Sequence, residues 1–484
     1  MQAAAWSYHR SLIPAFFIFL VSGVAAISLY EPLLLIIPFG WILVPLIFNY
    51  AVTQTEQLYW LLFITLPLST ELNITPQLGM DLPDEFLLIL LTGITLLKWI
   101  HQPRWFQFSV WQHPLIMVVT IYLVWIFITC LYAVEPALSF KYLLAKTWYI
   151  IPFVVLPQVI LHTKARLHKM AVCLLVPMLL VVTVTLLRHG FYGFSFESIK
   201  NILDPFFRNH VNYSSMLVCL LPVAWCIWQL TPPDNPRRKW IMYGIFIGLA
   251  GLVFAYSRGA WMALLAGITA IWVMRKKMMG AVIVLLVLGV LISMVWLITD
   301  KHYMRFAPDH DRTIFHTDFG EHIKATLEMN DVSTAERFYR WIAGGRMLAD
   351  KPLTGFGPNS FYKQYRPYTV NRFETWVSNN PEHSTVHNYF ILIALEQGVM
   401  GLVLFCFLYS GMLLHAQRLY HQLQSRVYRT IALTTGIVLC MIGVINFLSD
   451  MIETDKIGSL FWLCLGMIVL LEEKSKEEKQ FLAA

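Results

Sequence analysis

Three residues in this sequence have side chains suited to binding a phosphate and accepting a proton. Arg258 stands in a very short link between two apolar runs, so its guanidinium is confined to a membrane surface. A guanidinium binds two phosphate oxygens at once through its fork of N–H donors. Arg337 offers a second guanidinium in the longest polar stretch. His387 begins the next apolar run, and histidine can accept a proton near neutral pH.

Further polar residues accompany these three. Arg340 follows Arg337 by three positions, so one face of a helix would carry both. Arg208 and His210 stand where another apolar run begins, and Asn388 stands directly after the histidine of the first group. A lone arginine at a membrane surface often only extends its charge to water. The grouping, rather than any single residue, therefore indicates a site that these residues support.

Two patterns could hold a metal ion instead. His383 and His387 are four positions apart, a spacing that suits two ligands on a helix. Pro381 indicates that the helix begins only near the second of them, and the sequence shows no third ligand nearby. Asp309-His310-Asp311 resembles the acidic pair of metal-dependent sugar transferases, but so short a pattern arises easily by chance. We therefore expect no metal and no cofactor.

The elements that must position these residues are membrane helices. The chain has 484 residues, of which 57% are hydrophobic and 13% charged, whereas soluble domains carry about 25% charged residues. A membrane-spanning helix needs roughly 17 to 25 residues. The apolar runs are 11–29, 32–50, 57–69, 84–100, 114–133, 143–161, 169–187, 211–230, 239–256, 259–274, 278–299, 388–412, 428–448 and 456–472. They predict an all-α polytopic membrane protein with about 12 to 14 transmembrane helices.

The basic residues predict the orientation of these helices. They gather in alternate links, for example at Arg237-Arg238-Lys239 and Arg275-Lys276-Lys277, whereas the other short links are acidic or neutral. The positive-inside rule makes the basic face cytoplasmic. Both termini are then cytoplasmic, and the candidate site residues share the outer face. The formal net charge of +7 thus reflects membrane topology, and we expect no nucleic-acid partner.

The same reading divides the chain into four parts. Residues 1–299 form N-terminal transmembrane helices, 300–386 a large external loop, 387–472 C-terminal transmembrane helices and 473–484 a cytoplasmic tail. In the loop, the capping-box pattern Ser333-Thr334-Ala335-Glu336 predicts a helix that ends before Pro352. Gly355 and Gly357 then predict a tight turn. A loop this long is more often functional than a simple linker.

These residues resemble the motifs of the bacterial O-antigen ligase and O-antigen polymerase superfamily. The resemblance covers roughly residues 200 to 412. It is carried by three groups: Ser257-Arg258-Gly259; Arg337 to Phe361 with Asp350-Lys351-Pro352-Leu353 and Gly355-Phe356-Gly357; and His387-Asn388-Tyr389 followed by Glu396-Gln397-Gly398 and Gly401. The first 200 residues are similar only in being helical and hydrophobic.

The resemblance implies a GT-C-like glycosyltransferase of the bacterial inner membrane with a periplasmic loop. Such an enzyme takes a glycan from undecaprenyl pyrophosphate at the periplasmic face and needs no metal. Arg258 and Arg337 would bind the pyrophosphate, and His387 would deprotonate or orient the acceptor hydroxyl. Arg208 and His210 would support the site.

The acceptor stays open at this stage. The ligase-like C-terminal motif favours lipid A-core, hence a role in lipopolysaccharide biosynthesis. A polysaccharide polymerase or a protein O-oligosaccharyltransferase would use the same chemistry. A transporter or flippase is a competing class, but transporters place ionisable groups near mid-membrane. Here Glu396 is the main such candidate, and the other notable charges gather at one surface.

Overall fold

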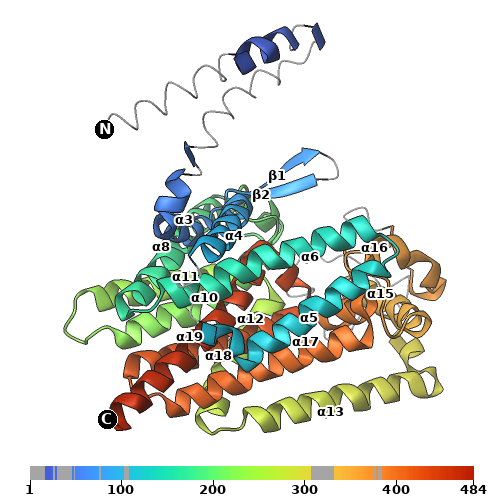
Figure 1. Ribbon diagram of the computed structural model, residues 1–484. Coiled ribbons are helices and arrows are strands. Elements are labelled where there is room, and N and C mark those ends of the chain that lie inside the picture. The colour runs from blue at the N-terminus through green and yellow to red at the C-terminus, as the bar shows by residue number, and fades with distance from the viewer. Residues whose placement is uncertain are drawn as a thin grey trace.

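The protein is a bundle of long helices (Figure 1). The computed structural model describes residues 17–25, 28–29, 46–47, 49–75, 78–102, 108–306, 332–374, 378–379 and 384–483. The main helices are α3 (Thr55–Thr65), α4 (Asp84–His101), α5 (Pro114–Leu131), α6 (Pro136–Ile150), α7 (Leu156–Ile160), α8 (Lys164–Phe191), α9 (Ile199–Ile202), α10 (His210–Leu230), α11 (Arg237–Val253), α12 (Arg258–Arg275), α13 (Met279–Ile298), α15 (Val332–Asp350), α16 (Phe361–Gln364), α17 (Tyr389–Gln422), α18 (Arg426–Leu448) and α19 (Asp455–Ala483). Short 3₁₀ helices and one π-helical segment, η4, lie between them: η3 (Phe108–Gln112), η4 (Ile151–Val155), η5 (Thr299–Phe306), η6 (Arg366–Tyr368), η7 (Asn371–Phe373) and η8 (Met451–Glu453).

Seven helices in the described part of the chain are long and apolar enough to cross a membrane. They are Pro114–Leu131, Pro136–Ile160, Lys164–Phe191, His210–Leu230, Met279–Met304, Tyr389–Gln422 and Arg426–Leu448. Each coincides with a predicted apolar run. Helices α4, α11, α12 and α19 occupy four further runs. The run 11–29 is described only at 17–25 and 28–29, and the run 32–50 lies largely outside the described residues, so the total of about 12 to 14 spans stays a prediction.

One short segment departs from the all-α expectation. Strands β1 (Thr70–Thr75) and β2 (Leu78–Leu82) pair antiparallel, with Thr70 opposite Leu82. The sequence predicts no strand between the apolar runs 57–69 and 84–100. A two-stranded ribbon is marginal alone and depends on neighbouring structure for its stability, and an apolar-run analysis cannot detect it.

Helix α18 packs against α10, α12 and α17 and so forms the centre of the part that carries the site. Its contact with α12 is reciprocal. A Cβ at Gly267 of α12 would collide with Met441 of α18, and a Cβ at Gly436 of α18 would collide with Met274 of α12. Each helix therefore uses a glycine to admit a methionine of the other. Small residues of this kind let membrane helices approach closely.

Helix α17 is broken at Gly398, where the backbone turns to φ 72 and ψ 179. The predicted glycine turn of the long polar loop, residues 300–386, fills this break. The amides of Phe356 and Gly357 donate to the carbonyls of Leu395 and Glu396, each at 2.9 Å. Gly355 has φ +67 and Gly357 φ +98, which confirms the predicted tight turn. Because a membrane helix cannot leave its carbonyls unpaired, the turn and the break stabilise each other.

Candidate active site

His387 lies in a short strap, residues 384–388, that leads into α17. Its backbone has φ 51, in the left-handed region that few non-glycine residues adopt. Asn388 caps the helix, with its Oδ1 accepting from the amide of Ile391 at 3.0 Å. Its Nδ2 donates to the carbonyl of Phe447 at 2.9 Å, at the end of α18. Asn388 therefore fixes the strap to α18, which is a structural role.

Helix α15, which confirms the predicted loop helix, holds the strap from the other side. Arg340 Nη1 donates to the carbonyl of Thr385 at 3.0 Å, and Trp341 Nε1 donates to the carbonyl of Val386, also at 3.0 Å. Arg340 is 5% exposed and pairs with Glu336 at 3.2 Å. Its guanidinium is therefore engaged with protein groups, contacts that favour a role in positioning the strap, and its participation in the site stays a prediction.

Asp450, in the link between α18 and α19, also holds the strap. Thr385 Oγ1 donates to Asp450 Oδ2 at 2.8 Å and accepts from the amide of His387 at 3.3 Å. Burial raises the pKa of Asp450 above its usual value. The strap before His387 is thus tied to α15, to α18 and to the link after α18. The available signal in the sequence was an aspartate directly after a predicted span.

Electrostatics keep the imidazole of His387 neutral. Burial, followed by the charges of Arg340 and Arg337, lowers the pKa of His387 to about 3. The residue as a whole is half-buried. A neutral imidazole can take up a proton, but two positive neighbours make it a weak base. An anion that compensated those charges would raise this pKa and strengthen the base.

The Arg258 turn lies at the same end of α18. Arg258 is the first residue of α12 and is half-buried. A Cβ on the adjacent Gly259 would lie 3.4 Å from Leu448 Cδ1, at the last residue of α18. The preceding residue of α18, Phe447, accepts the hydrogen bond from Asn388. Residues more than a hundred positions apart therefore meet at one helix end.

For the other predicted residues, the structure gives their position in the fold. Arg208 is exposed, and His210 opens α10, whose N-terminus Asn209 caps by accepting from two backbone amides. Helix α10 packs on α18, but the participation of Arg208 and His210 in the site stays a prediction. The metal patterns at His383 and at 309–311 lie outside the described residues.

A buried ionic group behind the strap was missed by the sequence reading. Lys146 of α6 pairs with Glu453 of η8 at 2.9 Å, and Tyr142 donates to the same carboxylate at 3.0 Å. The Lys146 side chain is only 5% exposed. A lysine inside an apolar run is a signal for a buried partner. The pair anchors η8, which directly follows Asp450.

Comparison with known families tests the resemblance. Residues 243–406 match the family model described as O-Antigen ligase. The chain carries an O-antigen ligase domain. This domain runs from α11 into α17 and includes Arg258, Arg337, Arg340, His387 and Asn388. The predicted family resemblance is confirmed over this range. Comparison with curated proteins finds no match.

The remaining site residues lie on either side of the O-antigen ligase domain. Arg208 and His210 precede the matched range, whereas α18 and Asp450 follow it. The O-antigen ligase domain therefore contains Arg258, Arg337 and His387. Helix α18, whose end brings the Arg258 turn and the His387 strap together, lies outside the domain. The match over residues 243–406, together with seven helices long and apolar enough to cross a membrane in the described part of the chain, supports a multi-pass membrane protein.

Proposed function

We propose that the O-antigen ligase domain transfers a glycan from undecaprenyl pyrophosphate to an acceptor hydroxyl. The observation that carries the proposal is the meeting of the Arg258 turn and the His387 strap at the end of α18, with Arg337 near enough to lower the pKa of His387. Two guanidinium groups and a neutral imidazole are the groups this reaction needs.

The reaction follows from these groups. Arg258 and Arg337 bind the pyrophosphate oxygens and compensate the charge that grows as the phosphate leaves. The acceptor hydroxyl attacks the anomeric carbon, a C–O bond forms, and the bond from that carbon to the pyrophosphate oxygen breaks. His387 takes the hydroxyl proton, and lipid pyrophosphate departs. Bound phosphate offsets the charges of Arg337 and Arg340, so donor binding itself strengthens the base.

The membrane orientation supports a periplasmic reaction in the bacterial inner membrane. Short basic links mark the cytoplasmic face, and the site residues stand at the opposite helix ends. We propose lipid A-core as the acceptor because the C-terminal motif resembles that of ligases. A polymerase or a protein O-oligosaccharyltransferase would use the same site with another acceptor.

The buried charges do not favour transport. Glu396, the main intramembrane candidate, accepts from the amide of Phe361 at 3.2 Å and so holds the external loop. Lys146 and Glu453 neutralise each other beside the strap. These groups have structural partners, whereas a transporter needs ionisable groups that can exchange partners along a path.

The test is reconstitution of the purified protein with undecaprenyl-pyrophosphate-linked glycan and lipid A-core. We expect glycosylated lipid A-core, and we expect His387→Ala to abolish transfer while donor binding stays close to native. The matched control is His168→Ala, because His168 is exposed on α8.

Other products would separate the alternatives. Longer lipid-linked glycans would identify a polymerase. Movement of the donor across liposomes without any covalent product would overturn the proposed glycosyl transfer.

A further inference from the structure

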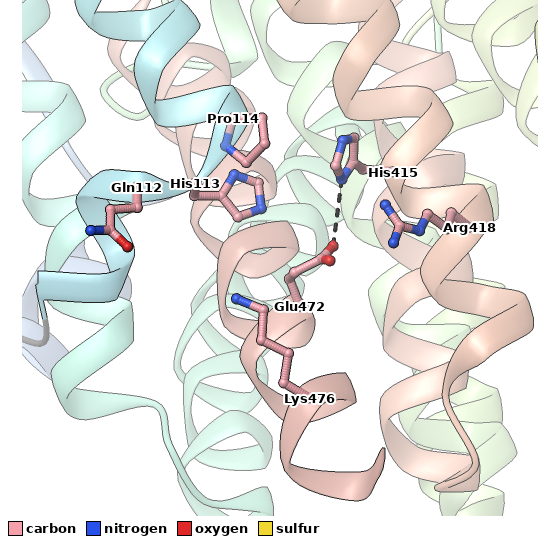
Figure 2. A pocket seen from close by; sticks show the side chains of 7 residues that line it. All are labelled: Gln112, His113, Pro114, His415, Arg418, Glu472 and Lys476. Carbon is pink, nitrogen blue, oxygen red and sulfur yellow. Dashed lines mark ion pairs between the residues drawn. The ribbon is translucent and has the colours of Figure 1, made fainter. Parts of the chain in front are cut away.

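A second cluster of chemically active side chains lies far from His387. His113 precedes α5, His415 lies near the end of α17, and Glu472 lies in α19. Figure 2 shows the three side chains converging on one pocket, which Gln112, Pro114, Arg418 and Lys476 also line. His415 is 17 residues beyond the break at Gly398 (415 − 398), so roughly 26 Å of helix separates it from that break, and the strap lies beyond the break.

The cluster has the ligand types and spacing of a metal site. Each of the three residues offers one ligand atom, and these atoms lie within 4.8 Å of one another. Within the part of the chain that the structure describes, Nε2 of His113, Nδ1 of His415 and Oε2 of Glu472 are buried and make no hydrogen bond. Buried polar atoms normally form hydrogen bonds, and three that converge without one are arranged to bind a single ligand together.

One distance favours a tetrahedral ion over a hydrogen bond. Nδ1 of His415 lies 3.5 Å from Oε2 of Glu472, which is longer than the usual hydrogen-bond range. Two ligands of one tetrahedral zinc, each at about 2.0–2.1 Å from the ion, stand about 3.4 Å apart. The pair is therefore already spaced as zinc ligands are.

We propose that His113, His415 and Glu472 bind a zinc ion that joins α5, α17 and α19. Two imidazoles and one carboxylate are a ligand set that zinc uses with a fourth position left for water. This site is independent of the proposed glycosyl transfer and lies at the other end of α17.

Two features oppose metal binding and set its expected strength. His113 Nδ1 accepts from the amide of Leu115 at 3.2 Å. If Nε2 binds zinc, the neutral ring carries its proton on Nδ1, so Nδ1 can no longer accept and this hydrogen bond is lost. Arg418 adds a positive charge to the pocket. Lys476 does so less, because it pairs with Glu473 at 2.8 Å. Arg418 therefore weakens zinc binding, and its removal is a sharp test.

The experiment uses the full chain, purified in detergent through a tag without histidine and stripped with a chelator. After zinc chloride is added and excess removed, we expect about one zinc per chain by elemental analysis. His415→Ala and Glu472→Gln should each weaken binding at least about tenfold. The exposed His168 gives the matched control, His168→Ala, which should bind as the native chain does.

Arg418→Gln separates the metal proposal from an anion site built on the same residues. If the site binds zinc, the Arg418→Gln variant should bind zinc as tightly as the native chain or more tightly. Inorganic phosphate should then give the native chain no protection against thermal unfolding. The glutamine variants preserve shape, and size-exclusion profiles report folding.

The proposal is overturned by an absence of zinc binding in the folded native chain, or by binding that survives loss of His415 and Glu472. If phosphate raises the thermal unfolding midpoint of the native chain and Arg418→Gln abolishes this effect, the pocket binds an anion and the zinc proposal is likewise overturned.

Discussion

Arg340 offers the clearest separation of a positioning role from a phosphate-binding role. Its guanidinium is buried, donates to Thr385 in the strap and pairs with Glu336. Arg340→Met keeps the length of the side chain but leaves the Glu336 carboxylate, 8% exposed, without its cation. Removing one partner of a buried ion pair costs about 3–5 kcal/mol. Ser378 still donates to Glu336 at 2.5 Å, so we expect the lower end, about 3 kcal/mol.

The loss should extend to catalysis through the strap. Without the bond to Thr385, His387 is held less firmly, and a displacement of about 1 Å can cost about a hundredfold in rate. The assays are the thermal unfolding midpoint in detergent and the kcat and KM for donor. We expect a lower midpoint and a lower kcat with little change in donor affinity.

The double variant Arg340→Met/Glu336→Gln provides the control. It removes both charges together, so most of the lost stability should return while the loss of kcat remains. A native midpoint in Arg340→Met, accompanied by a large rise in the donor KM, would refute the positioning role. Arg340 would then bind phosphate directly, as Arg337 is proposed to do.

Three further predictions follow from the site and its supports. Burial and two arginines lower the pKa of His387 from 6.5 to about 3, so the free enzyme holds this base neutral throughout pH 5–7. The value of kcat/KM should therefore not fall as the pH is lowered through 6.5, and a fall there would contradict the assigned environment of His387. Arg258→Lys should lower kcat/KM at least about tenfold, because a point charge does not replace a fork, and full activity would remove the bidentate argument. Gly398→Ala should destabilise the protein by more than the ~1–3 kcal/mol of backbone strain at φ +72, because its Cβ would also collide with the carbonyl oxygen of Leu353. Gly289→Ala, in open space on α13, should leave the unfolding midpoint at or above the native value.

The sequence alone determined which segments are helical and which residues can do chemistry. Apolar runs long enough for lipid predicted the places of the spanning helices because a membrane leaves a chain few other ways to pair its backbone. The glycines at 355 and 357 predicted a turn because few other residues adopt positive φ readily. Arg258, Arg337 and His387 stood out because charge and basicity belong to the side chain itself.

Only the tertiary structure decided what each residue touches. Arg337 and Arg340 look equivalent on one helix face, yet Arg340 is engaged with Thr385 and Glu336. The partners of the strap come from segments whose separation along the chain no local pattern records, as Asp450 illustrates. His113, His415 and Glu472 form a cluster for the same reason. Local preferences act over a few residues, whereas these contacts depend on how whole helices pack.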